Sequence, residues 1–350
     1  MKKIAGVLFI LLLFYSNVLG AEDVKKPSPA KDFEYDLNGE GTGVIIKKYL
    51  GKDVEVIIPE VIKTFPVVSI GNEAFSSSGL ESITIPDSVK EIRNEAFYNC
   101  KNLKTVILGK GVERIGYEAF YNSGLESITI PDSVKEIGNE AFKDCENLKT
   151  VILGKNVETI GYEAFYNSGL ESITISDSVK EIRNQAFCGC KNLKTVILGK
   201  GVETIEDSAF SSSALESITI PDSVKEIRNQ AFCGCKNLKT VILGKGVETI
   251  EDSAFSFSGL ESITIPDSVK EIRDRAFYVC ENLKTVILGK GVETIEDSAF
   301  SSCLNLTTFN ILTIREIEYG YSAFYSCPNL SDESKAKIKA TGYKYGFYDY

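Results

Sequence analysis

The stretch LESITIPDSVKEI, residues 80–92, decides the fold of this chain because it is repeated almost unchanged. Further copies begin at Leu125, Leu170, Leu215 and Leu260. Only one of them departs from the phrase, with Ser176 in place of the proline. A second phrase, LKTVILGKGVETI, alternates with the first, and its copies begin at Leu193, Leu238 and Leu283. A single globular core is not encoded by near-identical segments, whereas a stack of equivalent units is.

An Ala-Phe pair marks each unit of this stack. Twelve such pairs occur, and the spacing between their phenylalanines alternates between 22 and 23 residues until a final step of 24. Two successive units therefore form a double unit of 45 residues. The phenylalanines are Phe75, Phe97, Phe120, Phe142, Phe165, Phe187, Phe210, Phe232, Phe255, Phe277, Phe300 and Phe324.

Each unit has the pattern of a short strand followed by turns. Alternation over residues 82–85 points Ile83 and Ile85 inward, a Pro-Asp-Ser or Gly-Lys-Gly turn follows, and a short helical turn around Phe97 closes the unit. The period and the L-x-x-I-x-I spacing are typical of leucine-rich repeats. The sequence predicts an α/β repeat fold: a leucine-rich-repeat solenoid with a parallel β-sheet on its concave face, short second strands and helical turns.

The phrases SIGNEAFSSSGLESITIPDSVKEI and AFYNCKNLKTVILGKGV resemble the BspA-like leucine-rich-repeat proteins, over roughly residues 54–330. One departure is that the Asn expected after the strand is mostly Ser or Gly, with Asn156 as the exception. The resemblance implies a surface protein that adheres to host, matrix or cell-surface proteins. It implies no cofactor.

Charged residues alternate in sign from one unit to the next, in three columns. These columns run from Glu81 and Lys104 to Glu261 and Lys284, from Asp87 and Lys110 to Asp267 and Lys290, and from Lys90 and Glu113 to Lys270 and Glu293. Neighbouring strands lie about 4.8 Å apart, so identical units would stack like charges on one another. Alternation instead brings opposite charges together and disfavours a slip by one unit.

The ends of the chain predict export and capping. Two lysines precede an apolar run from Ile4 to Tyr15, which is typical of a signal peptide cleaved after Gly20, with Ala21 as the alternative. The predicted organisation is a signal peptide over 1–20, a flexible tether over 21–36, an N-terminal cap over 37–70, twelve leucine-rich-repeat units over 71–327, and a C-terminal cap with a Tyr-rich tail over 328–350. Ser331 is expected to cap a short helix that Gly342 ends. The mature protein is expected outside the cell or at its surface, with the periplasm as an alternative.

Composition disfavours several classes of function. The net charge is −10, and loss of Lys2 and Lys3 with the signal peptide makes it −12, so nucleic acid is a poor partner. No later apolar stretch reaches membrane length, so we expect no membrane insertion after signal cleavage. The chain has no histidine, which removes Ser-His and Cys-His catalytic systems and most zinc sites. We expect no catalytic residues, no metal and no enzyme activity.

Seven of the nine cysteines lie three residues after a repeat phenylalanine, which favours buried thiols. Most of them occur on every second unit, too far apart to bond. Cys280, Cys303 and Cys327 lie on successive units and could form a disulfide.

The outward strand positions are the candidate binding surface. They are Thr84, Ile107, Thr129, Ile152, Thr174, Ile197, Thr219, Ile242, Thr264 and Ile287. Two interpretations stay open: β-branched residues favour strands in general, or the isoleucines form a ligand-binding face. The leading hypothesis is an exported, non-catalytic binding protein that acts as a surface adhesin through a protein partner. The alternative is a structural or shielding surface or periplasmic protein without a specific ligand.

Overall fold

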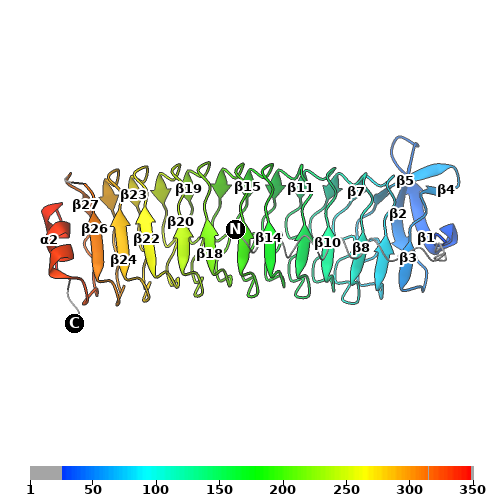
Figure 1. Cartoon of the computed structure of the whole chain (residues 1–350). Coiled ribbons are helices and arrows are strands. Elements are labelled where there is room, and N and C mark those ends of the chain that lie inside the picture. Colours follow the sequence, from blue (N-terminus) through cyan, green and yellow to red (C-terminus); the bar gives the residue numbers. More distant parts are fainter. Residues whose placement is uncertain (1–25, 314, 348–350) are drawn as a thin grey trace, which may run out of the picture.

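A computed structural model describes residues 26–313 and 315–347 of the chain. Figure 1 shows a long row of rungs, each rung being one repeat, with two sheets that run side by side along a nearly straight row. The repeats of the sequence are therefore successive rungs of a β-solenoid. Its core contains the Ala-Phe pairs of all twelve repeats, each buried.

The first sheet has twelve strands, all paired in parallel, and carries the outward Thr and Ile positions. Its strands are β3 (Glu55–Ile57), β6 (Ser82–Thr84), β8 (Thr105–Ile107), β10 (Ser127–Thr129), β12 (Thr150–Ile152), β14 (Ser172–Thr174), β16 (Thr195–Ile197), β18 (Ser217–Thr219), β20 (Thr240–Ile242), β22 (Ser262–Ile265), β24 (Thr285–Leu288) and β26 (Thr308–Ile311).

The second sheet has fifteen strands and contains the predicted short second strands. They are β1 (Phe33–Leu37), β2 (Val44–Tyr49), β4 (Val61–Ile62), β5 (Phe65–Ile70), β7 (Glu91–Ile92), β9 (Arg114–Ile115), β11 (Glu136–Ile137), β13 (Thr159–Ile160), β15 (Glu181–Ile182), β17 (Thr204–Ile205), β19 (Glu226–Ile227), β21 (Thr249–Ile250), β23 (Glu271–Ile272), β25 (Thr294–Ile295) and β27 (Glu318–Tyr319). From β5 to β27 the main row is parallel, whereas β1–β2 and β4–β5 are antiparallel pairs.

The 45-residue double unit is visible in the strand register. β10 pairs with β12 over three residues, whereas it pairs with β8 only through Ser127 and Thr105. The same contrast recurs at β14, β18 and β22. Each Ser-Ile-Thr strand is thus more fully paired with the Thr-Val-Ile strand that follows it than with the one before it.

The third side of each rung is built from β-turns and corrects the predicted helical turns. The N–H of Tyr98 donates to the carbonyl of Glu95 at 3.0 Å, but the N–H of Phe97 donates to Ala119 of the next rung at 2.8 Å. Glu95 (φ 59°) and Asn99 (φ 56°) have positive φ, which a right-handed helix excludes. These two positions recur in most repeats. A helix would use every N–H within the rung, whereas here alternate N–H groups bond the next rung.

The phenylalanines stack along the axis, with neighbouring ring centroids 5.0 to 5.6 Å apart from Phe75 to Phe324. This spacing is close to the roughly 4.8 Å between paired strands, so all sides of the solenoid rise by similar amounts. A sheet becomes concave when the opposite side is built from wider elements such as helices. Figure 1 shows the row as nearly straight in one view, and the concave form of the 12-stranded sheet stays a prediction.

The N-terminal cap begins earlier than predicted. A 3-10 turn, η1 (Ala30–Asp32), leads into β1, which pairs with β2 and so orders part of the segment predicted as a flexible tether. Phe33 is buried against Tyr49, with ring centroids 5.5 Å apart, which explains why this stretch packs. Ser28 covers the free edge of β3, since its N–H donates to the carbonyl of Ile57 at 2.8 Å. The predicted signal peptide over 1–20 lies outside the described residues.

The C-terminal cap confirms the expected helix. Helix α2 (Asp332–Ala340) follows Ser331, whose hydroxyl accepts from the N–H of Ser334 at 3.2 Å, and Gly342 has φ 116°. The hydroxyl of Ser334 accepts from the N–H of Phe309 at 2.9 Å, so α2 covers the edge of β26. Figure 1 shows α2 at the end of the row.

Candidate functional site

The ten predicted surface positions all lie on one face, which we call the Ile/Thr face: the outward side of β6 to β24. On each strand the residue between two outward positions is buried, as at Ile83 and Val106. The isoleucines are exposed for 57% of their surface at Ile107, 43% at Ile152, and 59% at both Ile197 and Ile242. Ile287 is half-buried. The sequence placed every member of this row correctly, because period-two alternation fixes the side of a strand.

The face is ridged along its length. Ile197 on β16 and Ile242 on β20 stand on either side of the shorter Thr219 on β18. A hollow of about 1090 Å³ lies over these three strands and is lined by all three residues, with Lys200, Asp222 and Lys245 at its rim. Isoleucine strands therefore form ridges and threonine strands form troughs.

Opposite charges border this face, as the alternating columns predict. Lys149 lies 3.9 Å from Glu171, and Lys155 lies 3.3 Å from Asp132. The aspartates also make an interaction that the sequence did not predict. Asp177 Oδ1 accepts from the backbone N–H of Lys200, on the next rung, at 2.8 Å. The equivalent bonds at the other aspartates are 2.7 to 2.9 Å long. Each aspartate thus holds the turn of the next rung.

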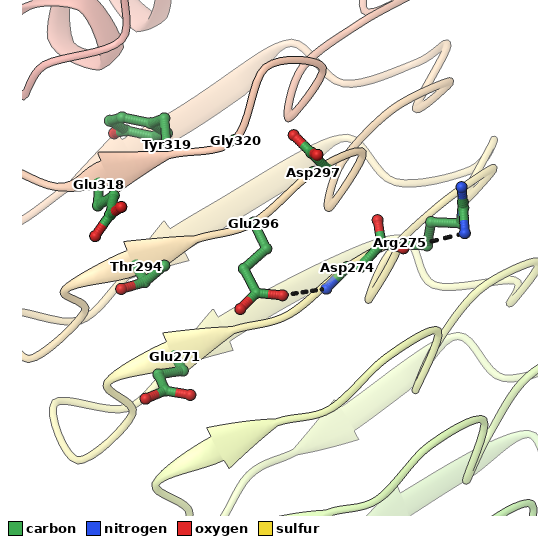
Figure 2. A pocket seen from close by; sticks show the side chains of 9 residues that line it. All are labelled: Glu271, Asp274, Arg275, Thr294, Glu296, Asp297, Glu318, Tyr319 and Gly320. Carbon is green, nitrogen blue, oxygen red and sulfur yellow. Dashed lines mark hydrogen bonds and ion pairs between the residues drawn. The ribbon is translucent and has the colours of Figure 1, made fainter.

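A second candidate site is an acidic pocket beside β23, β25 and β27, with a volume of about 560 Å³. Figure 2 shows its carboxylates on successive rungs. Glu296 Oε2 accepts from the N–H of Asp274 at 3.1 Å, and Arg275 pairs with Asp274 at 3.0 Å. The lining residues are Glu271, Asp274, Arg275, Thr294, Glu296, Asp297, Glu318, Tyr319 and Gly320.

Burial and crowding shift the titration of this pocket. Burial raises the pKa of Asp274 above its usual range; Arg275 opposes the shift, and Asp252 and Asp297 add to it. Burial likewise raises the pKa of Glu296 and of Glu251 in the neighbouring rung. Asp274 Oδ1 is buried without a hydrogen-bond partner. Asp274 and Glu296 are therefore partly desolvated and are repelled by the other acidic groups around them when charged.

The sequence signal for the acidic pocket was present and was missed. At the position three residues before the phenylalanine, most other rungs carry Asn or Tyr. Asn94 is one of these, and its Oδ1 accepts from the N–H of Tyr117 on the next rung at 3.1 Å. Three successive rungs before the last one carry Asp252, Asp274 and Asp297 there. A search of that column for unbroken acidic runs would have found the pocket.

The repeat cysteines are buried thiols that donate to the backbone. Cys190 Sγ donates to the carbonyl of Phe165 at 3.1 Å, and burial raises the pKa of Cys190 to about 12. Cys280 and Cys303 donate in the same way to Phe255 at 3.1 Å and Phe277 at 3.2 Å. Cys327 Sγ donates to the carbonyl of Phe300 at 3.0 Å. A disulfide among Cys280, Cys303 and Cys327 would remove such bonds; it stays a prediction, which non-reducing peptide mapping would check.

Two features are absent from the described residues: a metal-holding cluster and a membrane-spanning helix. Within residues 26–313 and 315–347, no group of three or more Cys, Asp or Glu side chains is arranged to hold a metal ion. In the same described ranges, no helix is both long and apolar enough to cross a membrane.

Comparison with known proteins agrees with the repeat geometry. The model of the "BspA type Leucine rich repeat region", in 6 copies, matches residues 68–194 and 203–331. Among solved structures, the chain is similar to a leucine-rich repeat protein from Bacteroides ovatus, with 29% identity, 87% of this chain and 81% of that chain covered, and a TM-score of 0.64. It shares its fold with the pneumococcal vaccine antigen PcpA, with 22% identity, coverage of 90% and 96%, and a TM-score of 0.52. No curated protein matches it.

Because the family model covers well over half of the chain and coincides with the stacked rungs, this chain belongs to the BspA-type leucine-rich-repeat family.

Proposed function

We propose that this protein is exported and acts at a cell surface as a non-catalytic binding protein, with the Ile/Thr face as its contact surface. One observation carries the proposal: isoleucines exposed for 43–59% of their surface recur on β8, β12, β16 and β20, every second strand of the sheet. Exposed apolar rows of this kind mark protein-binding sites, since they cost solvation when left uncovered. Membership of a surface-protein family supports adhesion to host, matrix or cell-surface proteins as the biological setting.

The geometry favours many modest contacts over one deep site. Each double unit offers the same ridge and trough, so a long partner meets equivalent contacts along the face. Linked contacts raise the overall affinity above that of any single one. A repeated surface therefore suits an extended protein partner better than a small molecule.

The test is a variant with Ile107, Ile152, Ile197, Ile242 and Ile287 all changed to Thr. It should lose at least about ten-fold in affinity for proteins captured from a matrix extract, measured by surface plasmon resonance, because apolar contact area is removed. A matched control changes five exposed apolar residues elsewhere to Thr: Leu37, Leu50, Val61, Phe257 and Leu304. Equal retention of ligand by both variants would discard the Ile/Thr face as the contact surface.

Export has its own test. Expression of the full chain in a secreting host should yield a mature protein whose N-terminus follows Gly20. N-terminal sequencing of protein from the medium or periplasm checks this, and recovery of the intact N-terminus from the cytosol alone would contradict export.

A further inference from the structure

The Ile/Thr face is complementary to itself in shape. Ridges of isoleucine lie on β8, β12, β16, β20 and β24, and troughs of threonine lie on β6, β10, β14, β18 and β22. Adjacent ridges are two strands, or about 9.6 Å, apart. A second copy shifted by one strand therefore presents a ridge to each trough.

The same strands are complementary in charge. Each threonine strand is flanked by two carboxylates, as β14 is by Glu171 and Asp177. Each isoleucine strand is flanked by two lysines, as β16 is by Lys194 and Lys200. A strand that fits by shape thus also fits by charge, because both properties alternate with the same period.

One symmetry operation satisfies both conditions. A two-fold axis parallel to the strands and passing between β14 and β16 reverses the row, so that β16 lies opposite the partner's β14 and β18 opposite the partner's β12. The ten strands β6 to β24 alternate and their number is even. Full overlap therefore sets every threonine strand against an isoleucine strand, and every carboxylate flank against a lysine flank. In this arrangement Ile152 of one copy enters the hollow over Thr219 of the other.

We infer that the occupant of the Ile/Thr face is a second copy of this chain, packed face to face and antiparallel in a two-fold dimer. The inference rests on the proposed function of this face as a protein-binding surface. A second copy and a matrix protein would compete for the same residues. An interface of this kind is isologous and closes on itself, as most stable homo-oligomers do.

The dimensions fit a stable dimer. Ten strands span about 43 Å, and the seven residues from one charged column to the next span about 20 Å. The face then measures about 900 Å² per copy, and the two copies together bury about 1,800 Å², the size of a standard stable interface. The strands β8 to β24 point the same way along the row in Figure 1, so the ridges and troughs of the two copies run in the same direction.

The experiment uses the full mature chain and two charge variants. An acidic variant changes Lys149, Lys155, Lys194 and Lys200 to Glu. A basic variant changes Glu171, Asp177, Glu216 and Asp222 to Lys. In the dimer these residues meet across the two-fold axis, so each variant alone opposes like charges over four central strands. Sedimentation velocity should show the wild type as a dimer, each variant as a monomer with Kd raised more than ten-fold, and an equimolar mixture as a heterodimer.

Restoration in the mixture separates loss of the interface from loss of the fold. A control changes four lysines bordering the 15-stranded sheet, Lys135, Lys180, Lys225 and Lys270, to Glu and should leave the dimer intact. The wild-type dimer should also weaken more than ten-fold from 0.1 to 1 M NaCl, since the screening length falls from about 10 to about 3 Å.

Two results would overturn the inference. A wild type that stays monomeric at high concentration excludes the second copy, while the isoleucine variant still decides whether the face binds another protein. A dimer that persists in both charge variants places its interface elsewhere. If the isoleucine variant also keeps every ligand, the proposed function fails as well.

Discussion

The Ile/Thr face and the acidic pocket are made from the same repeat, yet they treat charge in opposite ways. On the face, each carboxylate has a lysine on the neighbouring rung, as Lys149 has Glu171. In the pocket, Glu296 and Asp297 follow Asp274, so acidic rungs succeed one another, and burial with crowding raises the pKa of Asp274 and of Glu296. The difference shows that alternation of charge sign from rung to rung allows a stacked fold to carry many charged residues without repulsion between like charges.

The largest expected effect tests whether the two regions share one core. Phe210→Ala in the regular region and Phe277→Ala beside the pocket should each lower the free energy of unfolding by about 3–5 kcal/mol, because both rings are fully buried in the stack. Urea denaturation followed by circular dichroism measures both. A loss at Phe277 much smaller than at Phe210 would mean that the regions differ in packing as well as in charge.

The next effect separates the regions. Arg273 lies 3.1 Å from both Glu251 and Glu271, so Arg273→Met should lower stability at pH 7 by about 1–3 kcal/mol by leaving these carboxylates without their cation. The matched change in the regular region is Lys180→Met, which removes an exposed pair with Glu203 at 2.9 Å. That change should cost no more than about 1 kcal/mol. Equal losses in thermal or urea unfolding would erase the contrast between the regions.

The smallest effect depends on pH. Since its folded pKa is raised, Asp274 favours the folded state below its unfolded pKa of about 3.9, and this contribution is lost as pH rises through the folded value. Asp274→Asn should therefore stabilise the protein at pH 7 by up to about 0.5 kcal/mol and change little at pH 3. Urea unfolding at both pH values checks it. A stabilisation that is the same at pH 3 and pH 7 would exclude titration of Asp274 as its cause.

Much of the fold could be predicted because the same sequence pattern occurs in twelve repeats. The Phe column, the strand positions and the cap helix after Ser331 follow from spacing and local preferences. The turn side could not, because Glu95 and Asn99 adopt positive φ only when a neighbouring rung bonds the alternate N–H groups.

The candidate sites divide in the same way. All ten Ile and Thr positions could be predicted, since a strand has only two sides. The acidic pocket is not visible in the consensus sequence of the repeat. The pocket arises where Asp274 and the equivalent residues of the neighbouring rungs depart from that consensus. The early strand β1 was missed because Phe33 is stabilised by Tyr49 on another strand, which local sequence does not report.

The two-strand register also limits how such a gene can grow or shrink. Losing one repeat would place two rungs next to each other whose charged columns have the same sign. It would also leave one strand with the less complete pairing on both sides. Duplication or deletion of 45 residues keeps every junction as it was. Residues 171–210 and 216–255 differ at only one position, as expected if length changes by whole pairs through unequal recombination. Natural length variants of this chain should therefore carry an even change in the number of repeats.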